Sequence, residues 1–82
     1  MGKYFEYNDS IYDITNRYPE TLDLFITNGF EHMRDEKMRE TFGKSISLEM
    51  ALHMKKINID TFVDRMIEII EENKTVIDDS LI

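Results

Sequence analysis

The sequence predicts an all-α fold: a compact orthogonal bundle of four to five short helices that forms a single domain over residues 1–82. Two observations lead to this prediction. In the last third of the chain, apolar residues recur at the three- and four-residue spacing of one helix face. Upstream of that segment, Ser, Asp and Pro residues that commonly begin helices alternate with glycines that commonly end them.

Residues 1–9 are predicted to form an extended arm that lies on the domain, because residues 3–7 are aromatic and alternate loosely. The first helix is expected in "IYDITNR", directly after the cap residues Asn8, Asp9 and Ser10. Side-chain oxygens of such residues accept hydrogen bonds from the first turn of a helix, so the arm should end where this helix begins.

The second helix is predicted in "PETLDLFITN". Pro19 suits its first position, since the missing N–H is not needed there. Gly29 should end the helix, because the residue after a helix commonly has a positive φ. Leu24 points away from the apolar face of this helix, which consists of Leu22, Phe25 and Ile26.

Three more helices are expected after this one. The third lies in "DEKMRETFG", with Asp35 as its cap and Gly43 as its end. The fourth lies in "SLEMALHMKK", with Ser47 as its cap and an inward face made of Leu48, Ala51 and Leu52. The last begins at Ile59 and has a buried stripe made of Ile59, Phe62, Val63, Met66, Ile67 and Ile70. Residues 74–82 are expected to form a frayed tail.

Composition excludes several kinds of function. The chain has no cysteine, which excludes a disulfide, a thiol nucleophile, a redox dithiol and a thiolate metal site. A net charge of −7 disfavours binding to nucleic acid and to an anionic membrane surface. No apolar run is long enough to span a bilayer, and we expect a cytoplasmic protein.

The segment "LEMALHMKKINIDTFVDRMIEI" has the outline of a helix-turn-helix. Its second helix would expose Asp60, Asp64 and Glu68, and these carboxylates would face DNA phosphates and repel them. We therefore interpret the segment as two packed helices and expect no nucleic-acid partner.

The two histidines are the first candidates for chemistry. Glu49 and His53 are four residues apart and His32 lies near two carboxylates, but a tight metal site needs three or four ligands. We expect no stoichiometric metal, no cofactor and no response to thiol reductants. We also expect no enzymatic activity, because there is no Gly-rich phosphate loop and the candidate hydroxyls have capping roles: those of Ser10, Thr21, Ser45 and Ser47.

The methionines leave two interpretations open. Methionine has a flexible, polarizable side chain that suits either an adaptable binding groove or an irregular gap in a core. We favour the core for the five that fall in or near helices, which are Met33, Met38, Met50, Met54 and Met66.

The runs "IYDITNRYPETLDLFITNGF", "FGKSISLEMA" and "INIDTFVDRMIEI" resemble the domain of unknown function 1858 family, which is related to the N-terminal domain of iron–sulfur cluster repair proteins. The resemblance covers about residues 8–72 and implies a small all-helical domain. It is carried, in order, by Ile11, Ile14, Tyr18, Pro19, Glu20, Thr21, Phe25, Gly29, Ser47, Leu48, Glu49, Ala51, Ile59 and Asp60.

One branch of that family carries paired cysteines just after the glycine and is described as a redox disulfide domain associated with hybrid cluster proteins. This chain has the cysteine-free run "GFEHMRDEKMRETFGK" at that place, so no redox role transfers to it. Relatives without these cysteines look like companion domains, either fused or separate, of sensory or hemerythrin-like domains. The resemblance therefore implies an accessory module.

We expect an accessory or protein-interaction domain that serves a larger sensory or iron–sulfur/redox-related protein. A protein partner or a second copy would dock on an aromatic ring, an imidazole and two apolar side chains, because such groups are common in interface cores. These candidate binding residues are Leu24, Phe30, His32 and Met33. Two alternatives are left open: Phe30 and Met33 turn inward and complete the core, or the domain binds a small ligand or a metal.

Overall fold

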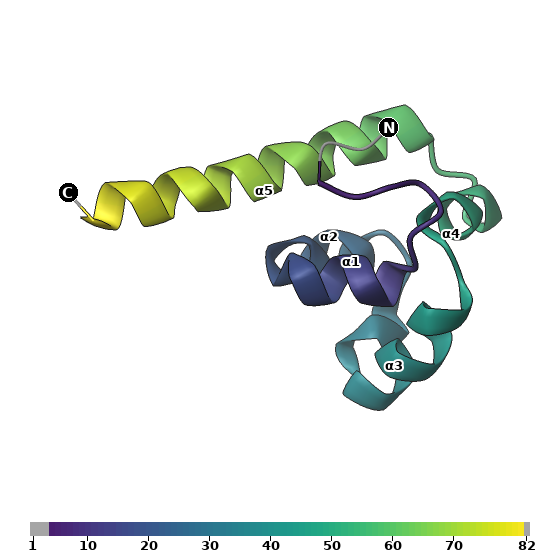
Figure 1. The fold of residues 1–82 in the computed structure, drawn as a ribbon. Helices are drawn as coiled ribbons and strands as arrows, with labels where there is room; N and C mark the ends of the chain where they lie inside the picture. Colours follow the sequence, from purple (N-terminus) through teal and green to yellow (C-terminus); the bar gives the residue numbers. More distant parts are fainter. Residues whose placement is uncertain (1–3, 82) are drawn as a thin grey trace.

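Five α-helices and two short 3-10 turns make up the part of the chain that the computed structural model describes, which is the backbone of residues 4–81 and the side chains of residues 4–74. They are α1 (Ile11–Arg17), η1 (Pro19–Thr21), α2 (Leu22–Thr27), η2 (Glu31–Arg34), α3 (Glu36–Ser45), α4 (Leu48–Met54) and α5 (Ile59–Leu81). Helices α1 to α4 lie together below α5, which extends past them (Figure 1). No strand occurs within residues 4–81, and the predicted all-α fold is confirmed.

Three predicted helix caps are confirmed. The Ser10 hydroxyl accepts a hydrogen bond from the Asp13 N–H at 3.1 Å, at the start of α1. The Asp35 carboxylate accepts from two N–H groups of α3, at 2.8 and 3.2 Å. The Ser47 hydroxyl accepts from the Met50 N–H at 3.2 Å in α4. Each cap satisfies a donor that the first turn of its helix leaves unpaired.

The segment from Pro19 to Asn28, predicted as one helix, divides into η1 and α2. Proline opens the segment as expected, but the first turn is a tight 3-10 turn. The reason lies in Thr21, which is fully buried and donates to the Tyr18 carbonyl twice, from its N–H at 2.9 Å and from its hydroxyl at 2.7 Å. These two bonds hold the turn in the three-residue spacing of a 3-10 helix.

Gly29 has a φ of +107°, which confirms that it ends α2 in the left-handed region. The Phe30 N–H then donates back to the Phe25 carbonyl at 3.1 Å. The two rings also pack edge to face, with 5.8 Å between their centroids. This combination of a returning hydrogen bond and an apolar contact is the Schellman arrangement, and it directs the chain after Gly29 back onto the core.

Gly29→Val is expected to lower the free energy of unfolding by about 2 kcal/mol, since a β-branched residue is strained at a positive φ. Gly29→Asn is the matched control, because asparagine tolerates this region better and should cost about half as much. Thermal unfolding followed by circular dichroism measures both. Equal effects of the two substitutions would contradict the conformational explanation.

The hydrophobic core lies between α5 and the shorter helices. The stripe predicted on α5 is buried at Phe62, Val63, Met66 and Ile70 and partly buried at Ile59 and Ile67. On α4 the predicted inward residues Leu48, Ala51 and Leu52 are fully buried. Phe25 of α2 and Phe62 of α5 meet with 5.1 Å between their ring centroids, so these two helices contact each other through aromatic side chains.

The N-terminal arm packs on the domain as predicted, but it is not extended throughout, and its residues 1–3 lie outside the described part. Phe5 is buried in the core. A turn follows, in which the Asp9 N–H donates to the Glu6 carbonyl at 3.1 Å and the Asp9 carboxylate accepts from the Glu6 N–H at 2.8 Å. That hydrogen bond and the Arg17 guanidinium, 2.9 Å away, lower the pKa of Asp9.

The same arm caps α4. The first N–H groups of a helix have no partner within the helix and need one elsewhere. The Leu48 N–H donates to the Asp9 carbonyl at 2.9 Å. The Glu49 N–H donates to the Tyr7 carbonyl at 3.0 Å. Backbone of the arm therefore satisfies two donors of a helix that lies about forty residues later in the sequence.

Gly43 does not end α3, contrary to the sequence prediction. The helix continues to Ser45 and Gly43 is buried within it. The neighbouring helix α1 gives the reason: a Cβ on Gly43 would lie 3.1 Å from the Cβ of Tyr12 and 3.2 Å from its Cα and N. Gly43 is therefore the position at which the backbones of α1 and α3 approach closely.

The frayed tail expected over residues 74–82 stays a prediction, and the structure describes the backbone of this segment as helix as far as residue 81. Residue 82 lies outside the described part. Neither glycine nor proline occurs after residue 43, so no residue of this segment interrupts the helical hydrogen bonds.

Candidate functional site

The predicted docking surface over Phe30, His32 and Met33 is not formed, because Phe30 and Met33 are fully buried. The alternative interpretation, in which both residues complete the core, is confirmed. The turn at Gly29 directs Phe30 onto Phe25, and η2 then places Met33 inside. The two residues therefore stabilise the fold and cannot contact a partner directly.

His32 is partly buried, and its ring stands perpendicular to that of Phe42, with 4.3 Å between centroids and an interplanar angle of 89°. Its Nε2 atom is buried and has no hydrogen-bond partner among the residues that the structure describes. A buried polar atom without a partner lowers stability, because it has lost its hydrogen bonds to water. His32 therefore packs as an aromatic residue, and its unpaired nitrogen lowers the stability of the native state.

His32→Phe is expected to raise the free energy of unfolding by about 1 kcal/mol, since a phenyl ring keeps the contact with Phe42 and removes the unpaired nitrogen. His53→Phe is the control: His53 is exposed, and its replacement should change stability by less than about 0.5 kcal/mol. Urea denaturation at pH 7 measures both. A loss of stability in His32→Phe would show that the nitrogen stabilises the native state.

Leu24 is partly buried and lies apart from the other predicted binding residues. It lines a hollow of about 270 Å³ between the end of α2 and the start of α5. The walls of this hollow are mostly apolar with amide and guanidinium groups among them: Leu24, Asn28, Ile57, Asn58, Thr61, Phe62 and Arg65. None of Phe30, His32 and Met33 lines it, so the structure does not bring the four predicted residues together.

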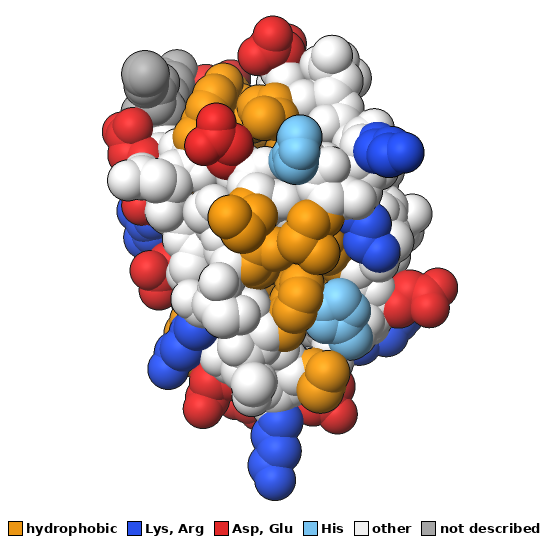
Figure 2. All heavy atoms as spheres, turned by 90° about the vertical axis from the view of Figure 1, so that its right-hand side faces the viewer, with side chains coloured by type: hydrophobic (Ala, Val, Ile, Leu, Met, Phe, Trp, Pro, Cys, Tyr) orange, Lys and Arg blue, Asp and Glu red, His pale blue; other side chains and the backbone are white. Residues whose placement is uncertain are grey.

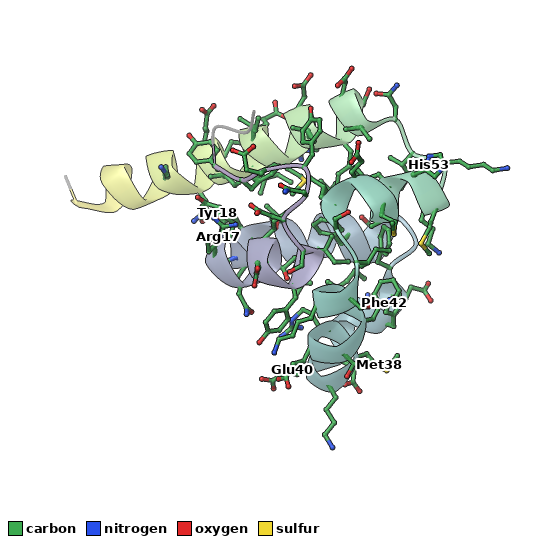
Figure 3. All side chains as sticks on the ribbon, turned by 45° about the vertical axis from the view of Figure 1, so that its right-hand side comes forward. Arg17, Tyr18, Met38, Glu40, Phe42 and His53 are labelled. Carbon is green, nitrogen blue, oxygen red and sulfur yellow. The ribbon has the colours of Figure 1, made fainter. Side chains whose placement is uncertain are left out.

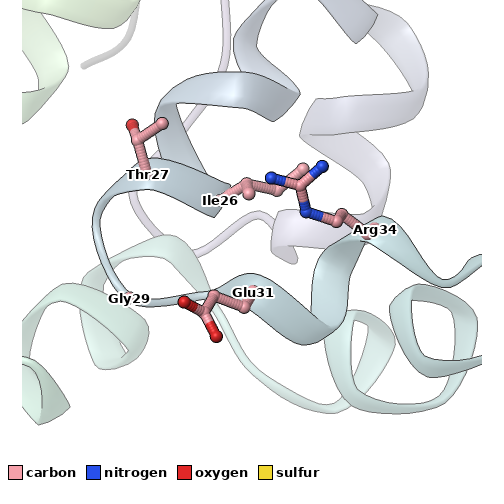
Figure 4. Close-up of a pocket in the computed structure, with 5 residues that line it drawn as sticks. All are labelled: Ile26, Thr27, Gly29, Glu31 and Arg34. Atoms are coloured by element: carbon pink, nitrogen blue, oxygen red, sulfur yellow. The ribbon is translucent and has the colours of Figure 1, made fainter.

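A second hollow lies at the turn after α2 (Figure 4). It is open, with a volume of about 770 Å³. Ile26 and Thr27 contribute from α2, Gly29 from the turn, and Glu31 and Arg34 from η2. The two charged side chains have opposite signs and the walls include only one large apolar side chain. This hollow therefore defines no particular ligand class.

The methionines divide between core and surface. Met33 and Met66 are fully buried, as the favoured core interpretation predicts. Met38, Met50 and Met54 are 46%, 56% and 56% exposed, and these three are not core residues. Four-residue spacing places Met50 and Met54 on one side of α4 and places Met38 on the same side of α3 as Phe42.

Figure 2 shows that hydrophobic side chains gather on one face of the molecule, with both histidines beside them. Figure 3 shows Met38, Phe42 and His53 on this side of the molecule. We define the methionine face as Met38, Phe42, Met50 and Met54, which come from α3 and α4. The i, i+4 spacing on both helices is the signal by which the sequence could have revealed this face.

A third hollow, of about 320 Å³, adjoins the methionine face on α4. Its lining consists of Ser47, Glu49, Met50, His53 and Ile59. It therefore combines a thioether, an imidazole and a carboxylate that lie within one and a half turns of α4.

Of the four hydroxyl groups predicted to have capping roles, those of Ser10 and Ser47 do cap helices, whereas those of Thr21 and Ser45 instead donate to backbone carbonyls three residues earlier. The Thr21 hydroxyl donates to the Tyr18 carbonyl. The Ser45 hydroxyl donates to the Phe42 carbonyl at 2.8 Å in the last turn of α3.

The described residues contain no metal-ligand cluster and no membrane-spanning helix, and the exposed side of α5 is acidic. Among the described residues, no three His, Cys, Asp or Glu side chains lie close enough to hold one metal ion. On α5, Asp60 and Asp64 are exposed, and Arg65 is engaged by Glu68 at 2.6 Å, so this helix presents an acidic surface. In the described part of the chain, no helix is both long and apolar enough to cross a bilayer.

The fold and these surfaces define a small all-α domain whose described residues include three exposed methionines, on α3 and α4. The chain belongs to the family described as Domain of unknown function (DUF1858), which matches residues 6–63. The match runs from the turn of the arm to the second turn of α5 and confirms the family that the sequence resembles. No curated protein and no solved structure matches the chain.

Proposed function

We propose that this domain is a non-catalytic protein-interaction module and that its partner docks on the methionine face. The observation that carries the proposal is the exposure of Met38 on α3 and of Met50 and Met54 on α4, each about half exposed. Figure 2 shows a face on which hydrophobic side chains gather. Soluble domains bury most of their large apolar side chains, and an apolar patch with a polar border is typical of a contact surface.

The chemistry of methionine supports this proposal. Its unbranched side chain changes shape at low cost, so a methionine surface adapts to the apolar side chains of a partner helix. Phe42, one turn after Met38 on α3, provides a rigid ring that packs perpendicular to the ring of His32. A rigid aromatic residue among adaptable methionines is a favourable arrangement for an interface core.

Net charge indicates the kind of partner. The chain carries a formal charge of −7, and Glu49 lies beside Met50 in the hollow on α4. A partner with apolar residues surrounded by Lys or Arg is electrostatically complementary, whereas a second copy of this acidic chain is repelled. We therefore propose a basic, apolar-centred protein segment and not self-association.

The wider setting is part of the same proposal. The domain serves as a cytoplasmic accessory module of a larger sensory or iron–sulfur/redox-related protein, and represents a cysteine-free branch of its family without the redox chemistry of paired cysteines. Acidic exposed residues on α5 support the absence of a nucleic-acid partner. The structural hydrogen bonds of Ser10, Thr21, Ser45 and Ser47 support a role without catalysis.

Site-specific photocrosslinking in the native cell tests the docking surface. A photoreactive residue in place of Met54 should capture one defined protein, while the same residue in place of Asp64, an exposed position on α5, should not. With that protein purified, the double variant Met50→Ser/Met54→Ser should weaken binding at least about tenfold, or about 1.4 kcal/mol, at an unchanged melting temperature. Equal capture from both positions, or full affinity of the double variant, would contradict the proposal.

The hollow at Leu24 favours a second candidate function, the binding of a small apolar ligand. This hollow has a volume of about 270 Å³ and mostly apolar walls, which also include the amide groups of Asn28 and Asn58. Such a lining suits a small apolar molecule that has one polar end. A fragment library screened by backbone NMR distinguishes the two functions. A ligand-binding domain should show saturable shifts at Leu24, Ile57 and Thr61, and Leu24→Ala should weaken them.

A further inference from the structure

We propose that one turn of α4 forms a binding site for a soft monovalent metal ion, Cu(I) or Ag(I), with Met50, His53 and Met54 as its ligands. This inference goes beyond the proposed interaction function and does not depend on it. It uses the thioether and imidazole groups of the exposed surface as electron-pair donors, where the docking proposal uses only their apolar area.

The placement of the three side chains carries the proposal. They occupy positions i, i+3 and i+4 of α4, a spacing that brings side chains onto one helix face with roughly 5–6 Å between their Cβ atoms. All three are exposed, and Met50 and Met54 are each 56% exposed. Met50 and His53 also line the same hollow. Met50 shares a face with both His53 and Met54, and the flexible side chains of the two methionines can turn toward the imidazole.

The type of ligand determines the type of ion. Thioether sulfur is a soft donor that selects Cu(I) among the common biological metals, and imidazole is a good second donor for it. Zinc is held by thiolate, imidazole and carboxylate, and the described residues bring no three such groups together. The net charge of −7 attracts any cation to the surface. Charge thus favours binding, and the two sulfurs provide the selectivity.

Structural roles do not compete for these side chains. The core contribution of α4 comes from Leu48, Ala51 and Leu52, which face the other way. A bound ion therefore requires no rearrangement of the fold. An ion held on one exposed helical turn exchanges readily, which is compatible with the prediction that the purified protein carries no stoichiometric metal.

Silver nitrate in chloride-free buffer is the probe, because Ag(I) has the ligand preferences of Cu(I) without its redox chemistry. The full 82-residue chain with ¹³C-labelled methionine methyl groups is titrated and followed by NMR. The methyl signals of Met50 and Met54 should shift and saturate at one ion per chain. Met38, which is 46% exposed but lies on α3, is the internal control and should not shift.

Leucine variants separate metal binding from docking, since leucine keeps the apolar volume and removes the sulfur. Met50→Leu/Met54→Leu should abolish saturable Ag(I) binding, His53→Gln should weaken it about tenfold or more, and Met38→Leu should leave it unchanged. Partner binding should survive the double leucine variant, so the failure of one proposal is distinguishable from the failure of the other.

Three results would overturn the proposal. The first is an equal shift of all exposed methionines, which would indicate non-specific silver binding. The second is full Ag(I) affinity in the double leucine variant. The third is saturable binding of Zn(II) at the same residues. A dispersed NMR spectrum of each variant establishes that it is folded.

Discussion

Phe25→Ala is expected to lower the free energy of unfolding by about 3–5 kcal/mol, because it removes the ring around which α2, the Gly29 turn and α5 pack. Phe25 is fully buried, with ring centroids of Phe62 at 5.1 Å and of Phe30 at 5.8 Å. A domain of this length is expected to have a total stability of only about 5–10 kcal/mol, so the variant should be partly unfolded near body temperature.

Urea denaturation followed by circular dichroism at the helix band measures this effect. Met50→Ala is the matched control, since it removes an apolar side chain of similar size from an exposed position and should cost only a few tenths of a kcal/mol. Phe62→Ala should be about as destabilising as Phe25→Ala, and the double variant should cost less than the sum, because the two rings share one contact. Strict additivity would show that the rings do not stabilise each other.

Gly43→Val is expected to lower the free energy of unfolding by about 3 kcal/mol, the upper range for overpacking a well-filled site. Helix propensity by itself predicts the opposite, since glycine inside a helix is less favourable than nearly any other residue. The decisive quantity is the 3.1–3.2 Å that would separate a Cβ on Gly43 from Tyr12, including the Cα and N of its backbone. Backbone atoms cannot rotate aside, so α1 and α3 would have to separate.

Thr41→Val on the same helix is the control, because Thr41 is exposed and should tolerate the change within about 0.5 kcal/mol. Melting temperatures of the two variants measure the difference. A Gly43→Val protein as stable as the parent would show that α1 and α3 are not in close contact at this glycine.

The two proposals concern the same face of α3 and α4 but use different properties of it. Docking depends on the apolar area of the methionine face, and metal binding depends on its sulfur atoms and on His53. Serine substitutions should impair both functions, and leucine substitutions should impair only the second. The family match ends at residue 63 and includes every residue of the methionine face, so both proposals can be examined in other members of the family.

Local sequence determined the helices of this protein. Ser10, Asp35 and Ser47 each cap the helix that follows them, and Gly29 ends α2 with a positive φ. The apolar spacing on α5 identified its buried face, including Phe62 and Met66. These features were predictable because a cap, a left-handed turn or a helical face is decided by residues within one or two turns of one another.

Tertiary structure alone decided which apolar residues remain at the surface and what the glycine of α3 does. The sequence presents Phe30 and Met54 as similar apolar candidates, yet one is fully buried and the other is 56% exposed. The sequence predicts that Gly43 ends α3, but the close approach of Tyr12 shows that this glycine allows α1 and α3 to pack together. The backbone of the arm caps α4, although the two segments are far apart in sequence. Each outcome depends on how helices pack against one another, which the residues of a single helix do not encode.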